Sequence, residues 1–328
     1  MKNKVVLITG GTGSFGKSFV KYALSKKPKK LIIYSRDELK QFEIKKTFNK
    51  SELKILRFFI GDVREYDRLL YALREVDYVI HAAALKQIDT CEYNPFEAIK
   101  TNILGAQNLI SASLSSGVKK VIALSTDKAS SPINLYGATK LASDKLFIAA
   151  NYHKGSSGAK FSVVRYGNVF NSRGSVVPVF LKRLKNNQSF EITDLKMTRF
   201  NITLDEGIKF VSNCLNFMEG GELFVPKLPS FNISDLAKAI DKKKNIKVIG
   251  VRPGEKIHEE MISENEPNDI IDMKSYYVVL PDMQMVSWSK KIYLKKGNLM
   301  KKKFSYRSDN NKNFLKVEDL SKLIKKLK

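Results

Sequence analysis

The chain is 328 residues long, which allows about two domains, and its 43% of hydrophobic residues supports a large buried core and excludes a disordered chain. Lysine and arginine number 58 against 33 acidic residues, which gives a formal net charge of +25. The basic residues are spread along the chain, and no nucleic-acid-binding motif accompanies them. We therefore expect a solvated basic surface that attracts anionic substrates, and no specific nucleic-acid partner. The only cysteines, Cys91 and Cys214, exclude a disulfide scaffold and a four-cysteine zinc site.

The N-terminal segment leads directly into a strand-like run. Met-Lys-Asn-Lys precedes the β-branched residues 5–9, and this apolar run is too short for the core of a signal peptide. No stretch of the sequence approaches the ~18–20 apolar residues of a membrane-spanning helix. We therefore expect a soluble, cytoplasmic protein without membrane insertion.

Strand-like and helix-like segments alternate through the first half of the chain. The expected strands are residues 5–9, 31–35, 56–61, 78–82, 120–125 and 161–166. The expected helices are residues 16–25, 67–73, 98–116 and 136–150. Near-continuous apolar strands separated by helices predict an α/β fold with a doubly wound parallel sheet, whose ligands bind at the carboxyl ends of the strands.

The alternation becomes looser after about residue 168, where glycine, proline and arginine interrupt helix-like pieces at 204–217 and 233–242. We expect residues 1–167 to form the larger, nucleotide-binding domain, which also receives part of about 200–228. Residues 168–328 are expected to form mainly a smaller α/β domain for the substrate, with interleaved segments.

A glycine-rich turn follows the first strand and opens the first helix. Gly10, Gly13 and Gly16 are three residues apart, and glycine lets backbone amides approach a pyrophosphate at the positive end of a helix. The strand–turn–helix context favours dinucleotide binding. The residues expected to contact the cofactor here are Gly10, Thr12, Gly13, Ser14, Phe15 and Gly16.

The end of the second strand bears on the choice between NAD and NADP. Ser35 and Arg36, with Lys40 nearby, suit the 2′-phosphate of NADP, because a guanidinium binds phosphate oxygens. Asp37 leaves NAD open, since an acidic residue at this place binds ribose hydroxyls. NADP is favoured, and Asp62 with Val63, after the third strand, is expected to contact the adenine.

Tyr136 and Lys140 are four residues apart on a predicted helix, and therefore lie on one face. A lysine ammonium near a phenol stabilises the phenolate, so that tyrosine can take a proton from a hydroxyl group. Together with the glycine-rich turn and with Ser125 and Thr126 at the end of the fifth strand, this spacing predicts oxidoreductase-type chemistry.

With these motifs the chain resembles the extended short-chain dehydrogenase/reductase family, from its first strand to at least Glu255. Within that family it is similar to the soluble inverting UDP-N-acetylglucosamine 4,6-dehydratases of pseudaminic acid biosynthesis, chiefly through the pair Asp127-Lys128. The matching stretches are residues 10–16, 35–41, 81–86, 125–129, 134–140, 165–169, 172–178, 197–200 and 252–256.

The resemblance implies a Rossmann-type fold, a tightly bound NADP that is recycled, and a lyase that dehydrates UDP-N-acetylglucosamine. Tyr136 would take the proton of the 4-hydroxyl, a neutral Lys128 would remove the proton on C5, and Asp127 would protonate the departing C6 hydroxyl. The implied product is UDP-2-acetamido-2,6-dideoxy-β-L-arabino-hex-4-ulose, a precursor for flagellin or surface glycans. The implied catalytic residues are Thr126, Asp127, Lys128, Tyr136 and Lys140.

Further contacts follow from the resemblance in the same way. Cofactor contacts are implied for Glu38, Leu39, Lys40, Ala82, Lys86, Tyr136 and Lys140. Substrate contacts are implied for Lys86, Asn168, Val169, Arg173, Arg199, Arg252 and Glu255, and each arginine has a structural salt bridge as the alternative. His153 and His258 lack partners at ligand spacing, so no metal site is expected.

Three questions stay open at this point. The first is whether the enzyme is a dehydratase of another UDP-sugar or a C4 epimerase, although Asp127-Lys128 argues against an epimerase. The second is whether the protein only binds NADP without catalysis, which the intact set of Thr126, Tyr136 and Lys140 disfavours. The third is the subunit number: the family implies a homo-oligomer, with a hexamer as the candidate.

Overall fold

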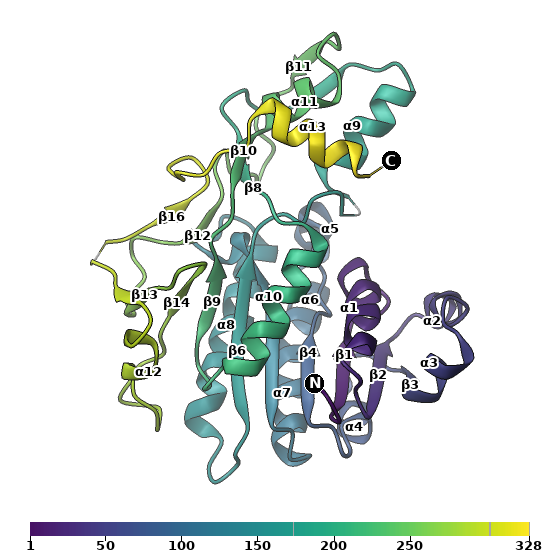
Figure 1. The fold of residues 1–328 in the computed structure, drawn as a ribbon, viewed down its shortest axis with the longest axis vertical. Coiled ribbons are helices and arrows are strands. Elements are labelled where there is room, and N and C mark those ends of the chain that lie inside the picture. Colours follow the sequence, from purple (N-terminus) through teal and green to yellow (C-terminus); the bar gives the residue numbers. More distant parts are fainter. Residues whose placement is uncertain (173, 302, 328) are drawn as a thin grey trace.

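A single large sheet organises the chain in the computed structural model, which describes residues 1–172, 174–301 and 303–327 (Figure 1). Its strands are β1 (Val5–Thr9), β2 (Lys30–Ser35), β3 (Leu56–Ile60), β4 (Tyr78–His81), β5 (Lys120–Thr126), β6 (Lys160–Tyr166), β9 (Leu223–Pro226), β13 (Ile270–Asp272), β14 (Tyr276–Val279) and β15 (Asn298–Leu299). The order is β15-β13-β14-β9-β6-β5-β4-β1-β2-β3. The strands from β3 to β9 in that order pair in parallel, and the other three pair antiparallel.

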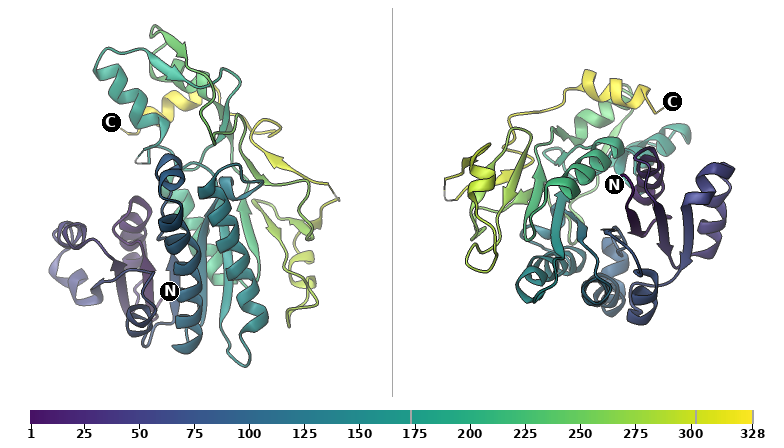
Figure 2. Two further views of the ribbon diagram at one scale, coloured as in Figure 1. Left: turned by 180° about the vertical axis from the view of Figure 1, so that it is seen from behind. Right: turned by 60° about the horizontal axis from the view of Figure 1, so that its bottom comes forward.

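Helices cover both faces of this sheet, so the predicted doubly wound α/β fold is confirmed. The helices on this part are α1 (Ser14–Ser25), α2 (Glu38–Lys45), α3 (Lys50–Ile55), α4 (Tyr66–Ala72), α5 (Ile88–Tyr93), α6 (Pro95–Ile99), α7 (Gly105–Ser115), α8 (Leu135–His153), α10 (Leu204–Phe217) and α12 (Lys291–Leu294). Helix α1 packs against α10, while α7 packs against both α4 and α8 on the opposite face (Figures 1 and 2).

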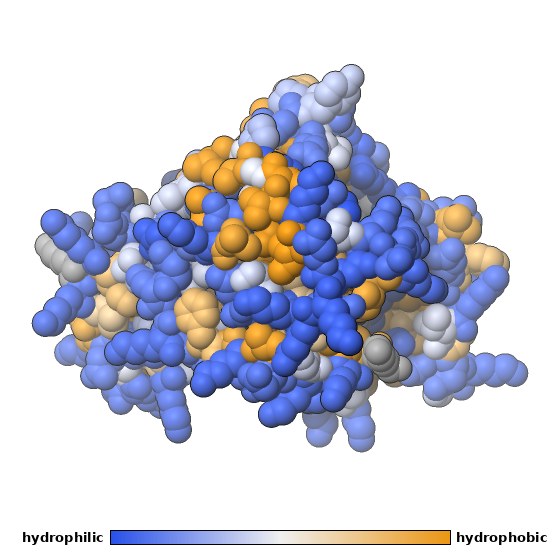
Figure 3. Space-filling view, turned by 90° about the horizontal axis from the view of Figure 1, so that it is seen from above, coloured by the Kyte–Doolittle hydropathy of each residue, from blue (hydrophilic) through white to orange (hydrophobic). Residues whose placement is uncertain are grey.

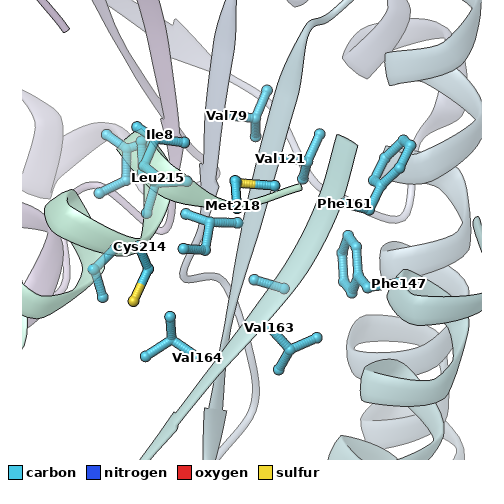
Figure 4. Close-up of a cluster of buried hydrophobic side chains, with 14 of the residues drawn as sticks. Ile8, Val79, Val121, Phe147, Phe161, Val163, Val164, Cys214, Leu215 and Met218 are labelled. Carbon is cyan, nitrogen blue, oxygen red and sulfur yellow. The ribbon is translucent and has the colours of Figure 1, made fainter. Parts of the chain in front are cut away.

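The core lies between these helical layers and the sheet. All five residues of β1, Val-Val-Leu-Ile-Thr, are buried, as expected for a parallel strand covered on both faces. Figure 4 shows strand side chains such as Val121 and Val163 between Leu215 of α10 and Phe147 of α8. Burying a side chain of this size contributes about 1.5–3 kcal/mol each.

The long helix predicted at residues 98–116 contains an interruption. A π-helical turn, Lys100–Leu104, separates α6 from α7 and turns the side chain of Asn102 inward. Its Oδ1 accepts from the backbone N–H of Leu85 at 2.9 Å, and its Nδ2 donates to Thr139 Oγ1 at 3.0 Å. The extra residue in the turn thus ties the loop after β4 to α8, which periodicity alone does not predict.

A smaller part of the chain lies beyond the carboxyl ends of the parallel strands (Figure 1). It contains β7 (Phe190–Ile192), β8 (Thr198–Phe200), β10 (Ser230–Asn232), β11 (Ile246–Val248), β12 (Glu260–Ile262), β16 (Tyr306–Arg307), α9 (Val176–Lys185), α11 (Ile233–Ile240) and α13 (Val317–Lys325). The strands pair two by two: β8 with β10, β7 with β11, and β12 with β16. A separate core that includes Phe180, Leu236 and Leu320 holds the helices together.

The chain passes repeatedly between the two parts. Residues 204–226 return to the large sheet as α10 and β9, and residues 270–299 extend it by β13, β14 and β15. Figure 3, which views the end formed by the smaller part, shows mainly hydrophilic side chains around an apolar area. Within the described ranges, none of the helices has the length and apolar character needed to cross a bilayer.

A buried histidine makes the stability of this core depend on pH. His81, at the end of β4, is hydrogen-bonded through Nδ1 to Thr9 Oγ1 at 2.8 Å, and its ring lies 5.5 Å from that of Phe147. Burial, with a smaller contribution from Lys140, lowers the pKa of His81 to about 3. His81 therefore takes up a proton near pH 6.5 in the unfolded chain but stays neutral at that pH in the folded chain. As a result, the free energy of unfolding falls as the pH falls through this range.

We predict that lowering the pH from about 7.5 to about 5.5 reduces the free energy of unfolding by about 1.4 kcal/mol more in the wild type than in His81→Asn. Urea unfolding curves at the two pH values measure the difference. The His81→Asn variant keeps all the other titrating groups, so its loss of stability is the reference for their contribution in the wild type. Equal losses in the two proteins would contradict the burial argument.

Candidate active site

The glycine-rich turn between β1 and α1 brings backbone close to backbone. Gly10 has a φ of +65°, and a Cβ there would lie 2.9 Å from the carbonyl carbon of Ala82. A Cβ on Gly16 would lie 2.5 Å from the carbonyl oxygen of Gly10. Gly13 caps α1 without a side-chain hydrogen bond, so the first N–H groups of the helix keep their capacity for an anionic ligand.

The end of β2 joins this turn through a buried hydroxyl pair. Thr12 Oγ1 and Ser35 Oγ lie 2.8 Å apart. Asp37 caps α2 by accepting from the backbone N–H of Lys40 at 2.9 Å, and its carboxylate also pairs with the ammonium of Lys40. Both carboxylate oxygens of Asp37 are therefore engaged with Lys40.

The other expected adenine-side residues lie around the end of β3. Asp62 receives Arg64 Nη2 at 2.8 Å and lies 3.6 Å from Arg36 Nη1. Burial opposes ionisation of Asp62, but the bonds from Arg64 outweigh it and lower the pKa. Val63 is buried, and a Cβ on Gly105 would lie 2.7 Å from it. In the first turn of α2, Glu38 and Leu39 are exposed.

Helix α8 carries the Tyr–Lys pair at its beginning. Asn134 caps the helix by accepting from the backbone N–H of Gly137 at 2.8 Å. Burial raises the pKa of Tyr136 to about 12, although Lys128 and the Thr126 hydroxyl counter part of the rise. Burial lowers the pKa of Lys140, against the opposing charge of Asp144. A positive charge bound beside the phenol would be needed to make Tyr136 a base near neutral pH.

Gly137 allows α8 to approach the turn that follows β5. This turn is a short 3-10 helix, Asp127–Ala129, capped by Thr126. A Cβ on Gly137 would lie 2.2 Å from the carbonyl oxygen of Lys128, a distance that no side chain tolerates. The absence of a side chain at Gly137 therefore determines how close Tyr136 comes to Asp127 and Lys128.

Asp127 and Lys128 form an ion pair at the carboxyl end of β5, in which Asp127 is buried and the side chain of Lys128 is 20% exposed. Asp127 is 0% exposed, and its Oδ1 accepts from Lys128 Nζ at 3.0 Å and from Thr126 Oγ1 at 2.9 Å. Its Oδ2 has no hydrogen-bond partner among the described residues. Burial and the nearby carboxylate of Glu259 raise the pKa of Asp127 above its ordinary value.

The sequence reasoning missed Glu259. This residue precedes β12, is 2% exposed, and accepts from Lys128 Nζ at 3.0 Å. Arg199 Nε lies 3.5 Å from the same carboxylate oxygen. The only signal for it in the sequence is a pair of acidic residues, Glu259 and Glu260, directly before an apolar strand, and such a pair does not reveal that one of them faces Lys128.

The two carboxylates decide the charge of Lys128 in this structure. Burial acts to lower the pKa of Lys128, but Asp127 and Glu259 outweigh it, and the pKa lies above its ordinary value. Lys128 is therefore an ammonium ion here, whereas the sequence-based mechanism expects a neutral base. Lys128 must pass its proton on before it can act in that role.

The residues expected to contact the substrate are only partly gathered around this pair. Asn168 Oδ1 accepts from Lys128 Nζ at 3.3 Å, and Val169 bridges to Ile202 beside it. Lys86 lies on the loop after β4 and is exposed overall. Partial desolvation of its side chain and, to a smaller extent, the charge of Lys128 lower the pKa of Lys86. Arg173 lies outside the described residues.

The two remaining arginines differ in exposure. Arg199 is buried, and it donates to the backbone carbonyls of Lys256 and Ile257 at 3.0 Å each. The side chain of Arg252 is 65% exposed and lies 3.3 Å from Glu255. Arg199 therefore links β8 to the 255–259 segment, whereas Arg252 keeps a guanidinium available to a ligand.

Comparisons with known proteins place this geometry in a family. A family model described as polysaccharide biosynthesis protein matches residues 6–281. An inverting UDP-N-acetylglucosamine 4,6-dehydratase of Campylobacter jejuni is 52% identical over 327 residues, covering 98% of this chain and 97% of that protein. The chain belongs to the polysaccharide biosynthesis protein family.

Two further proteins are similar to this chain over nearly its whole length. A UDP-glucose 4-epimerase of Rickettsia bellii is 41% identical over 334 residues, covering 98% of this chain and 95% of that protein. The solved structure of Pen from Bacillus thuringiensis has a TM-score of 0.90 and 39% identity, covering 99% of this chain and 98% of Pen. The resemblance to the extended short-chain dehydrogenase/reductase family is confirmed.

The described residues contain no group of three or more His, Cys, Asp or Glu side chains placed to hold a metal ion. His258 Nδ1 is hydrogen-bonded to Thr198 Oγ1 at 2.8 Å. His81 packs behind the glycine-rich turn, bonded to Thr9. Both histidines thus have structural partners.

We predict that Gly137→Ala destabilises the protein by about 1–3 kcal/mol, because the added methyl group forces the backbone of Lys128 away from α8. Ala138→Ser, at the exposed neighbouring position, is the matched control and is expected to change stability by less than about 0.5 kcal/mol. Urea unfolding measures both. A Gly137→Ala variant as stable as the control would show that the approach is not tight.

Proposed function

We propose that this protein catalyses the inverting 4,6-dehydration of UDP-N-acetylglucosamine to UDP-2-acetamido-2,6-dideoxy-β-L-arabino-hex-4-ulose, as an NADP-dependent hydro-lyase. The observation that carries the proposal is the Asp127–Lys128 ion pair, with Nζ 3.0 Å from Oδ1, held against the beginning of α8 beside Tyr136. The 52% identity with an inverting dehydratase supports the same reaction.

The turn after β1 fits a dinucleotide. The close approaches at Gly10 and Gly16 leave no room for side chains, and the uncapped beginning of α1 suits a pyrophosphate. A bound NADP would supply hydride transfer, with the hydride taken from C4 of the sugar and returned to C6, and the return would be balanced by a proton added to C5 on the face opposite to the one that lost its proton. The residues that would hold it are the glycine-rich turn, Ser35 and Arg36 at the adenosine side, and Lys140 beside the nicotinamide.

The residues of the chain then handle protons. Tyr136 takes the proton of the 4-hydroxyl as C4 becomes a ketone, and that ketone acidifies the hydrogen on C5. Passing one proton from Lys128 to Asp127 along their 3.0 Å hydrogen bond converts the ion pair into a neutral amine and a carboxylic acid. Lys128 then removes the C5 proton, and Asp127 protonates the C6 hydroxyl, which leaves as water. A placed acid or base contributes about 10²–10⁴-fold each.

The alternative is a C4 epimerase, which the 41% identity with a UDP-glucose 4-epimerase keeps in view. An epimerase needs Tyr136 and Lys140 but has no proton to remove from C5 and no hydroxyl to protonate at C6. The two buried carboxylates, Asp127 and Glu259, and the lysine between them would then have no chemical task. The cluster therefore favours dehydration.

Proton NMR of UDP-N-acetylglucosamine incubated with the purified protein in D₂O, without added cofactor, tests the proposal. We expect a C6 methyl signal, deuterium at C5 and couplings of the L-arabino configuration. A methyl group with D-xylo configuration would keep dehydration and contradict inversion. A product with the galacto configuration and no methyl group would identify an epimerase.

We predict that Tyr136→Phe and Asp127→Asn fail at different steps. Without the phenol, C4 is not oxidised, and the near-ultraviolet absorbance of reduced nicotinamide does not appear on addition of substrate. Asp127→Asn keeps that absorbance change but forms methyl product about 10²–10⁴-fold more slowly, because the C6 hydroxyl loses its acid. Loss of both signals in Asp127→Asn would contradict its assignment to the elimination.

We predict that Arg36→Gln weakens NADP binding about tenfold or more and leaves NAD binding unchanged, because a charged hydrogen bond to phosphate contributes about 1.5–3 kcal/mol. Calorimetric titration of the cofactor-free protein measures both constants. Arg57→Gln, on β3, is the control for the loss of one positive charge. Equal weakening for both cofactors would place Arg36 away from the 2′-phosphate.

We also propose a pathway, a cellular location and an oligomeric state for this enzyme. A 4-keto-6-deoxy UDP-sugar suits the first step of pseudaminic acid synthesis in the cytoplasm, where UDP-sugars are made. A homo-oligomer, with a hexamer as the candidate, completes the proposal. The molar mass in solution, from light scattering, tests the subunit number.

A further inference from the structure

The carboxylate of Glu259 is buried directly against the proposed catalytic pair. Its Oε1 lies 3.0 Å from Lys128 Nζ and 3.5 Å from Arg199 Nε. Its Oε2 has no hydrogen-bond partner within the part of the chain that the structure describes. Burying a carboxylate with one oxygen unbonded lowers the stability of the fold. A contribution to stability therefore does not explain why Glu259 lies here.

The backbone around Glu259 holds this carboxylate in place. The N–H of Glu259 donates to Ser308 Oγ at 2.9 Å, and the N–H of Ser308 donates to the carbonyl of Glu259 at 2.8 Å. Ser308 Oγ is also 2.7 Å from Thr198 Oγ1. Segments from three distant parts of the chain therefore fix the position from which Glu259 reaches Lys128.

The proposed elimination needs a second carboxylate. When Asp127 carries the proton meant for the C6 hydroxyl, it is neutral and no longer offers negative charge to Lys128. Lys128 becomes an ammonium ion as it takes the C5 proton, and a fixed carboxylate beside it stabilises that developing charge. A base whose orientation is held by a buried acidic group follows the logic of the catalytic triads.

We infer that Glu259 is a positioning residue of the dehydration centre: it holds the Lys128 amine and supplies the negative charge against which Lys128 becomes an ammonium ion. The inference rests on the proposed function and assigns a role within that site. Glu259 acts through Lys128, so its removal affects the elimination and spares the oxidation at C4.

The charges around the pair give the inference a pH signature. The groups whose charges act on Lys128 or on Glu259 are Asp127, Arg199, Lys256, Lys86 and Tyr136. The active pair carries one proton, so the rate falls at low pH when Asp127 and Lys128 are both protonated, and at high pH when both are deprotonated. The negative charge of Glu259 raises the pKa of Asp127 and of Lys128 alike.

The test is the pH dependence of kcat for methyl product formation by the holoenzyme. We expect Glu259→Gln to move the acid limb to lower pH by about 1–3 units, the range of a close charge, and to lower the maximal rate about 10- to 10²-fold. The absorbance of reduced nicotinamide on substrate addition should persist. Loss of a merely structural residue would lower the amplitude without moving the limb.

Two further variants keep the test decisive. Glu260→Gln removes an equal charge one residue away, from a side chain bonded to Ser130 Oγ at 3.0 Å and Ser131 Oγ at 2.7 Å, and is expected to leave the profile in place. Glu259→Asp keeps the charge one methylene further back, and its shift should lie between those of wild type and Glu259→Gln. If Glu259→Gln does not fold, the pH profile of Glu259→Asp takes its place as the test. In either variant, an acid limb at the wild-type pH overturns the inference.

The product made by the wild type separates this inference from the proposed function. Wild-type dehydration with an unmoved acid limb in Glu259→Gln overturns the role of Glu259 and leaves the dehydratase assignment standing. A wild type that forms no methyl product overturns the proposed function, and with it the inference that rests on it.

Discussion

A partly buried ammonium ion between two buried carboxylates connects the two parts of this protein. Lys128 comes from the end of β5 in the large sheet, and Glu259 comes from the segment before β12, 131 residues later. Burying an unpaired charge costs several kcal/mol, so neither side of the cluster is stable in the interior without the other. The smaller part is thereby held over the carboxyl ends of the parallel strands, where a ligand of an open α/β sheet binds.

Helix α8 is the second element on which the arrangement depends. Its first turn carries Tyr136 and packs against the Asp127–Ala129 turn at a distance that only Gly137 permits. Its next turn is tied through Thr139 to Asn102 in the π-helical turn, and hence to the loop after β4. One helix therefore places the phenol relative to both the proposed acid–base pair and the loop after β4.

Much of the fold followed from local patterns in the sequence. Short runs rich in β-branched and aromatic residues, such as residues 5–9 and 161–166, are typical of buried strands, and the six predicted strands lie within a residue or two of the observed ones. Interruptions of a helix could not be predicted from local sequence patterns. The π-helical turn exists because Asn102 satisfies groups of Leu85 and Thr139, which are distant in sequence.

The candidate site divides in the same way. Local spacing indicates the glycines of the first turn and Tyr136 four residues before Lys140, and the resemblance to the dehydratases points to the adjacent Asp127 and Lys128. The charge of Lys128 and the place of Glu259 beside it follow from tertiary contacts. A pKa depends on burial and on charges within a few ångströms, and these come from chain segments whose proximity no local pattern records.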